Sequence, residues 1–399
     1  MIQPEKNNKK VLRLFCVLFC VCFAMLPEAI WAATLYLLPQ SQTVYQGDSF
    51  IVELRINTED EEINAVEIGL TFPVDLLEVV DFSKGNSILT LWLAKPKIQK
   101  GEIIFLGGIP GGFNGEGLLA KITFLGKEIG KSEISFKENS RVLLNDGKGT
   151  PAKLSLSEGN YEIIKKPEGL PQISSETHPD QNKWYNNLTF HLRWDLIEGI
   201  EYSYLLSYDP LSEPDEIPDK PEGELIWMGD MEYKGLEDGI YYFTLRQKLP
   251  DEDWSKKITY RAMIDTTIPE PFELKTGKAP LVFEGKYFLS FAAQDRASGI
   301  DYYEAVEADR RGYQRGTTRK AEWKIAESPY LLEDQSLKSV IKVKAVDKAG
   351  NERIAEIIPP YKITWKDVLV IILVLIGAGV IWWNLKSRLS RITSRGAQK

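Results

Sequence analysis

Short runs in which apolar residues recur at every second position constrain this chain more than any other feature of its sequence. Between Phe50 and Ile56 the apolar positions share one face of an extended chain, while Glu53 and Arg55 take the other. Residues 66–72 repeat the pattern, and similar runs lie at 103–106, 120–125 and 133–136. This period predicts half-buried strands. With Gly-rich turns between the strands, the expected fold class is all-β, an antiparallel sandwich.

An internal repeat at a spacing of 100 residues divides the rest of the extended region. The residues that recur are Asp195, Gly199, Ile200 and Tyr202, which are matched by Asp295, Gly299, Ile300 and Tyr302. Two copies of one β-module explain this spacing. The expected domains are a β-sandwich at 33–165, a linker at 166–171, and two further modules at 172–268 and 269–362.

Both ends of the chain carry apolar runs that point to a membrane. Basic residues followed by an apolar run at 11–25 predict a signal peptide over 1–32 that is cleaved after Ala32, the alternative being an uncleaved anchor. A second run predicts a transmembrane helix at 366–385, and the basic segment 386–399 predicts a cytoplasmic tail; a buried soluble helix is the alternative. The expected location is the cell membrane, single-pass, with the N-terminal modules outside.

Composition excludes several classes of protein. The 49 Lys and Arg against 57 Asp and Glu give a net charge of −8, which does not suit a nucleic-acid binder. The three cysteines all lie in the predicted signal peptide, so a thiol metal site is not expected in the mature protein. With two histidines and no nucleophile motif, an enzyme is not expected, although the sequence cannot exclude a catalytic carboxylate pair.

The first module resembles the bacterial cohesin family, the receptor modules of cellulosome scaffolds. The resemblance covers about a third of the chain, and its motifs stand at 47–50 (GDSF), 64–72, 74–80 (VDLLEVV), 101–105 (GEIIF), 115–124 (GEGLLAKITF) and 126–130. It implies a nine-stranded jelly roll, calcium-dependent capture of dockerin modules and a setting of polysaccharide catabolism. The family's partner-binding positions fall here on Ala65, Glu67 and Ile109; Glu67 is compatible with that role, whereas Ala65 and Ile109 depart from the family pattern.

The second and third modules resemble bacterial immunoglobulin-like or fibronectin-type repeats. The residues that carry this resemblance are Trp194-Asp195, 238–243 (DGIYYF) and 345–351 (AVDKAGN). Such repeats imply spacers between the first module and the membrane.

Three further features are candidate sites. If Leu89, Leu91 and Leu93 share one strand face, Trp92 points outward and offers a sugar or partner platform; packing into the core is the alternative. The Gly-rich stretch 107–117 is expected to be a mobile loop that shapes a partner site. Acidic residues at 209–224 and the segment 347–351 raise the question of calcium, but a solvated loop and a tight turn are the simpler interpretations.

The histidines offer no metal site of their own: His191 is expected at the surface, no cofactor is expected, and metal binding stays open. The sequence therefore predicts a membrane-anchored surface protein that binds and tethers, its partner being a dockerin-like module or a surface glycan. The alternative is a structural envelope protein or adhesin without such a ligand.

Overall fold

The structure is a computed structural model that describes residues 32–220, 228–308, 322–359 and 365–396. The predicted signal peptide, with all three cysteines, therefore lies outside the described residues except for Ala32. Contacts divide the chain into two compact units. One unit contains Met1–Ala305, Trp323–Leu332 and Val343–Ala355, and the other contains Val306–Glu322, Glu333–Lys342 and Glu356–Lys399.

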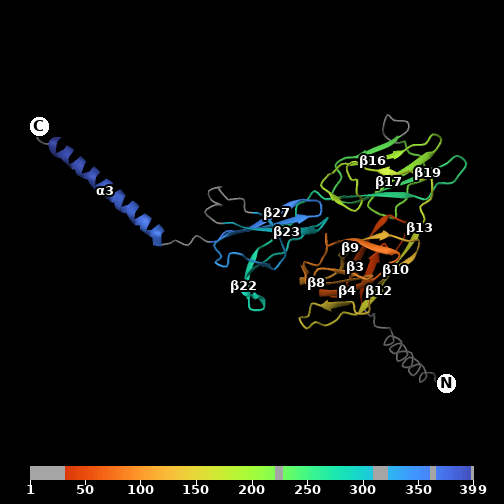
Figure 1. Cartoon of the computed structure of the whole chain (residues 1–399), viewed down its shortest axis with the longest axis horizontal. Helices are drawn as coiled ribbons and strands as arrows, with labels where there is room; N and C mark the ends of the chain where they lie inside the picture. The colour runs from red at the N-terminus through yellow and green to blue at the C-terminus, as the bar shows by residue number, and fades with distance from the viewer. Residues whose placement is uncertain (1–31, 221–227, 309–321, 360–364, 397–399) are drawn as a thin grey trace, which may run out of the picture. The chain divides into compact units, whose positions relative to one another are not determined.

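The first module is a sandwich of two sheets. One sheet has the order β12 (Leu154–Ser157), β1 (Ala33–Leu38), β3 (Ser49–Asn57), β9 (Glu116–Gly126) and β5 (Leu77–Ser83). The other has the order β2 (Ser41–Tyr45), β13 (Gly159–Ile164), β10 (Gly130–Phe136), β4 (Ile63–Thr71), β8 (Glu102–Phe113) and β6 (Leu91–Trp92), with β11 (Arg141–Leu144) on β4 and β7 (Lys97–Gln99) on β8. Figure 1 shows β3 and β9 of the first sheet and β4, β8, β10 and β13 of the second.

The alternating runs build the core of this sandwich. Phe50, Val52, Leu54 and Ile56 of β3 are at most 3% exposed, as the period of two predicts. Ile51 lies on the opposite face of β3 and is nevertheless 7% exposed, because it packs with Trp184 and Met263 of the second module in the same compact unit. The expected strands are confirmed, although the resemblance implied nine and residues 33–164 form thirteen, several of them very short.

Each of the next two stretches forms one three-stranded and one four-stranded sheet. The second module has β14 (Ile173–Ser174), β16 (Phe190–Asp195) and β18 (Met228–Tyr233), with β15 (Trp184–Tyr185), β20 (Ile258–Ile264), β19 (Gly239–Lys248) and β17 (Glu201–Ser207). The third has β21 (Lys275–Ala279), β22 (Val282–Ser290) and β25 (Tyr330–Leu331), with β24 (Lys324–Ala326), β23 (Ile300–Ala308), β26 (Val340–Asp347) and β27 (Glu352–Ile357).

The repeat has a structural counterpart at the turns that precede β17 and β23. Gly199 has a φ of 82° and Gly299 a φ of 84°, a left-handed conformation that glycine adopts without strain. The two recurring glycines therefore adopt the same conformation in both copies. The exact domain limits stay a prediction.

The last described element is α3 (Trp365–Gly396). It begins one residue before the predicted transmembrane helix at 366–385, covers that whole range and continues through most of the segment 386–399 that was expected to be a separate tail. Within the described residues, no helix is both long enough and apolar enough to span a membrane.

Candidate functional site

The register of four strands places two rows of side chains on one outer face of the first module. In the first row Leu143, Ala65, Gly108 and Leu91 are successive partners across β11, β4, β8 and β6. In the second row Arg141 pairs with Glu67 and Glu67 with Leu106. Directly paired residues of an antiparallel sheet project to the same side. We call these seven residues, together with Leu93, the β4–β8 face.

This face combines exposed apolar side chains with one ion pair. Leu91 is 45% exposed and Leu93 is 63% exposed, and the Leu93 N–H donates to the Leu106 carbonyl at 3.1 Å, which holds Leu93 beside the second row. The Arg141 guanidinium donates to Glu67 through Nε at 3.1 Å and also through Nη2. Since the Arg141 side chain is 60% exposed, the pair contributes little to stability, and its charges stay available to a partner.

Trp92 does not lie on this face. Its ring packs edge-on against Phe82, with ring centroids 5.9 Å apart, and at a tilt against Phe105, with centroids 5.5 Å apart. Its Nε1 donates to the Leu89 carbonyl at 3.1 Å. The predicted outward platform is therefore wrong, and the alternative of core packing holds. The prediction failed because it assumed one strand over residues 89–93, whereas β6 covers only two residues. Leu89 precedes this strand, and its side chain packs into the core, where it is 2% exposed.

Ile109 also points inward. It lies within β8, is 6% exposed and belongs to the core of the first module, so it cannot touch a partner directly. The expected mobile loop at 107–117 is wrong for the same reason, because β8 runs to Phe113 and β9 starts at Glu116. Gly111 and Gly112 adopt positive φ within β8, so these glycines shape a bent strand. Of the sequence candidates, the β4–β8 face brings together Ala65 and Glu67 only.

Sequence reasoning missed Arg141, Leu91 and Leu93 as members of the face. A basic residue on a strand opposite an acidic one was a weak signal for Arg141. No local pattern could show that β11 and β6 flank β4 and β8, because that register depends on segments far apart in the chain.

Three buried carboxylates could hold a cation. Asp265, Asp295 and Asp347 are 0%, 6% and 2% exposed, and one oxygen from each lies within 4.8 Å of the others. Burial raises the pKa of Asp295 to about 6 and also raises the pKa of Asp347. Carboxylate oxygens are the ligands that calcium prefers. The repeat singled out Asp295 and the 347–351 turn contains Asp347, but only the fold shows that they meet Asp265.

Backbone amides already engage this cluster. The Asp295 carboxylate accepts from the Gly299 N–H at 2.7 Å, the Asp265 carboxylate accepts from the Ser298 N–H at 3.0 Å, and the Asp347 carboxylate accepts from the Asn351 N–H at 2.8 Å. The bonds of Asp295 and Asp347 stabilise tight turns at 295–299 and 347–351, as the simpler interpretation of 347–351 expects, whereas the bond of Asp265 links two segments far apart in the chain.

The acidic segment 209–224 is described up to residue 220. There its carboxylates also accept bonds from nearby amides: Asp209 from the Leu211 N–H at 2.9 Å, and Asp219 from the Tyr204 N–H at 2.8 Å. Glu222 and Glu224 lie outside the described residues. Asp209 thus stabilises a turn, and Asp219 ties the segment to β17.

The two histidines differ in environment. His191 lies on the face of β16 opposite the buried Phe190, Leu192 and Trp194, as expected, but its side chain is only 16% exposed and its Nε2 lies 2.6 Å from Asp230. His178 is fully buried, and burial lowers its pKa to about 4.

Solved structures with low sequence identity match parts of the chain. A complex of CaCohA2, a protein from Clostridium acetobutylicum, with a variant of CaDoc0917 matches at 14% identity and a TM-score of 0.30, over 33% of this chain and 99% of that one. The third ScaB cohesin of R. flavefaciens, solved in complex with a group 1 dockerin, matches at 10% identity and a TM-score of 0.28, over 35% and 100%.

A longer match covers more of the chain. The I-band fragment I67-I69 of titin matches at 9% identity and a TM-score of 0.21, over 82% of this chain and 98% of that one. No protein-family model matches the chain, and no curated protein matches it. Over about a third of its length the chain is thus similar to cohesin modules, and it also has immunoglobulin-like neighbours.

Proposed function

We propose that the first module is a receptor that captures a partner protein module on its β4–β8 face. The observation that carries the proposal is the pairing of exposed Leu91 and Leu93 with the Glu67–Arg141 ion pair across four strands. An apolar centre with a charged pair is typical of protein interfaces. The cohesin resemblance of the sequence makes a dockerin-like module the first candidate partner.

A glycan is less well supported as the ligand of this face. Sugar recognition by an aromatic platform needs an exposed ring, and Trp92 packs against Phe82 and Phe105 instead. Among the eight residues that define the face there is no aromatic side chain. The face therefore favours a protein partner.

We propose further that the chain is held in a membrane through residues 366–385, with the three β-modules outside and the basic segment 386–399 inside. What supports this is the sequence: residues 368–383 carry no charge, and the five basic residues that follow come without an acidic one. If this is right, the protein stays in the membrane fraction after alkaline carbonate extraction, and external protease removes the β-modules. Release by carbonate would contradict the anchor.

The receptor proposal is tested by calorimetric titration of the full chain in mild detergent with a panel of dockerin modules in calcium. We expect saturable binding to at least one of them. Glu67→Lys replaces the carboxylate that pairs with Arg141 by a second cation, and it should weaken binding about tenfold. Leu93→Asp removes an exposed apolar contact and should also weaken it. Glu78→Lys makes the same charge change on β5 of the other sheet and should leave binding intact.

Binding that all three variants leave unchanged would move the partner site to another surface. If no dockerin binds, the receptor proposal fails, and the structural envelope role becomes the better account.

A further inference from the structure

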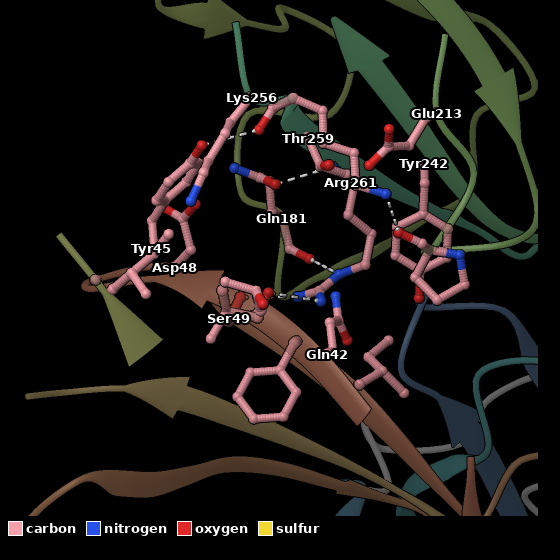
Figure 2. A pocket seen from close by; sticks show the side chains of 18 of the residues that line it. Gln42, Tyr45, Asp48, Ser49, Gln181, Glu213, Tyr242, Lys256, Thr259 and Arg261 are labelled. Carbon is pink, nitrogen blue, oxygen red and sulfur yellow. Dashed lines mark hydrogen bonds between the residues drawn. The ribbon is translucent and has the colours of Figure 1, made fainter. Parts of the chain in front are cut away.

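A polar pocket lies in the larger compact unit, between the first and second modules. It has a volume of about 620 Å³, and its walls come from β2 and the start of β3 on one side and from β19, β20 and the 179–182 segment on the other. Figure 2 shows Arg261 reaching across this pocket toward Ser49, with Gln181 beside it. This pocket is separate from the β4–β8 face.

Arg261 is the unusual residue of the pocket, because it is a buried charge whose hydrogen-bond partners are all neutral. It is 2% exposed, and its guanidinium donates to the Gln181 carbonyl at 2.9 Å, to Ser49 Oγ at 2.9 Å and to Asn182 Oδ1 at 2.7 Å. Among the described residues no carboxylate lies within ion-pair distance of it; burial lowers its pKa, and the charges of Asp180, Asp48 and Asp81 oppose that shift only in part. A buried charge that is balanced only by carboxylates at a distance is costly. An anion bound in the pocket would offset that cost.

A second cation lies at the rim of the pocket. Lys256 is exposed and lines the pocket, whereas Lys257 is committed to the Pro210 carbonyl at 3.1 Å and the Ser212 carbonyl at 2.8 Å. Arg246 lies 4.0 Å from Glu213, so its charge is already partly balanced. Arg261 from the floor and Lys256 from the rim are thus the two cations that can attract an anion.

The remaining lining suits hydroxyl groups. Asp48 and Glu213 line the pocket and offer carboxylate acceptors, and Thr259 and Gln181 add a hydroxyl and an amide. The buried Oε1 of Gln42 has no hydrogen-bond partner in the structure. A ligand that carries hydroxyl donors as well as an acid would satisfy both sets of groups.

The pocket also adjoins a second hollow. A second hollow of about 660 Å³ shares Gln42, Thr43, Pro210, Glu213 and Lys257 with the first. A ligand can therefore extend beyond a single small ring into the neighbouring hollow.

We propose that this pocket binds an acidic oligosaccharide, with a carboxylate directed toward Arg261 and Lys256 and with ring hydroxyls that donate to Asp48 and Glu213. The site adds a glycan specificity to the protein and does not rest on the proposed capture of a protein module.

The test is calorimetric titration of the full chain in mild detergent with penta-galacturonate, with cellopentaose as the neutral control and sodium acetate as the simple anion. We expect saturable binding of penta-galacturonate that weakens as salt is raised, because exposed charges are screened. Cellopentaose should bind at least about tenfold more weakly, and acetate should give no saturable heat, because one carboxylate alone lacks the hydroxyl contacts.

Two variants and one control locate the site. Lys256→Ala removes an exposed cation and should weaken penta-galacturonate binding about fivefold with the fold unchanged. Arg261→Gln removes the buried charge and should abolish binding; circular dichroism checks that this variant is folded. Lys97→Ala removes an exposed lysine on β7 of the first module, outside the pocket, and should change nothing.

Equal affinity for the neutral and acidic sugars would overturn the proposal, as would an absence of penta-galacturonate heat. An affinity that Lys256→Ala and Arg261→Gln both leave unchanged would overturn it as well. Failure here would leave the dockerin titration and its Glu67→Lys response untouched, since those variants lie on a different surface.

Discussion

At the scale of single residues, the direction of a side chain decides what it can do. Glu67 and Ala65 lie on the outer face that the alternation predicts, because β4 is a long and regular strand. The sequence also predicts that Trp92 and Ile109 contact a partner, but both pack against the core. Their neighbours Leu91 and Gly108 occupy the outer face instead. A shift of one residue in a strand exchanges its two faces, so alternation of apolar residues does not predict side-chain direction in short or bent strands.

His178 gives a prediction at this scale. Its ring is buried beside Tyr185 and Phe190, and burial lowers its pKa to about 4. Between about pH 6.5 and about pH 4 the unfolded chain binds a proton at this histidine and the folded chain does not. The free energy of unfolding should therefore fall as the pH is lowered through this window. Denaturant titrations at pH 7.5, 5.5 and 4.5 measure this free energy of unfolding.

The control for this prediction is His178→Asn. Since the variant has no titrating ring, its free energy of unfolding should fall less steeply with acidification than that of the natural chain. Parallel pH profiles of the two proteins would show that His178 does not cause the dependence.

At the scale of elements, close packing between strands depends on glycines that no periodicity marks. Gly229 of β18 pairs with Trp194 of β16, and a Cβ at that position would lie 2.2 Å from the indole. Gly108 of β8 is different, because the nearest atoms to a Cβ there lie at 3.7 Å. One glycine makes room for a core ring, and the other leaves space on the β4–β8 face.

Gly229→Ala should therefore destabilise the second module. The indole has to shift within a packed core, which costs about 1 to 3 kcal/mol. Scanning calorimetry should show a lower unfolding temperature for one transition of the full chain. The matched variant Gly108→Ala should leave the unfolding temperature unchanged or slightly higher, because the added methyl group meets its neighbours at ordinary contact distance and alanine restricts the unfolded chain. A neutral Gly229→Ala would contradict the packing argument.

At the scale of the whole molecule, the compact unit joins residues that the sequence assigned to separate modules. Ile51 of β3 packs with Trp184 and Met263, and Arg261 of β20 donates to Ser49 at the start of β3. Lys348 lies 2.5 Å from Asp81 of β5 in the same unit. The second and third modules were expected to act as spacers. In the larger unit the second module also contributes the far wall of a polar pocket, and the two modules together contribute a cluster of buried aspartates.

The sequence by itself determined the local periods: half-buried strands such as β3 and β4, a repeat of 100 residues, and glycines at equivalent turns. These features depend on neighbours along the chain, where the period of two and the freedom of glycine act directly. Only the tertiary structure decided that Arg141 meets Glu67, that Trp92 turns inward, and that Arg261 is buried with hydrogen bonds to Gln181, Asn182 and Ser49. Each depends on strand register or on packing between distant segments, which local patterns do not encode.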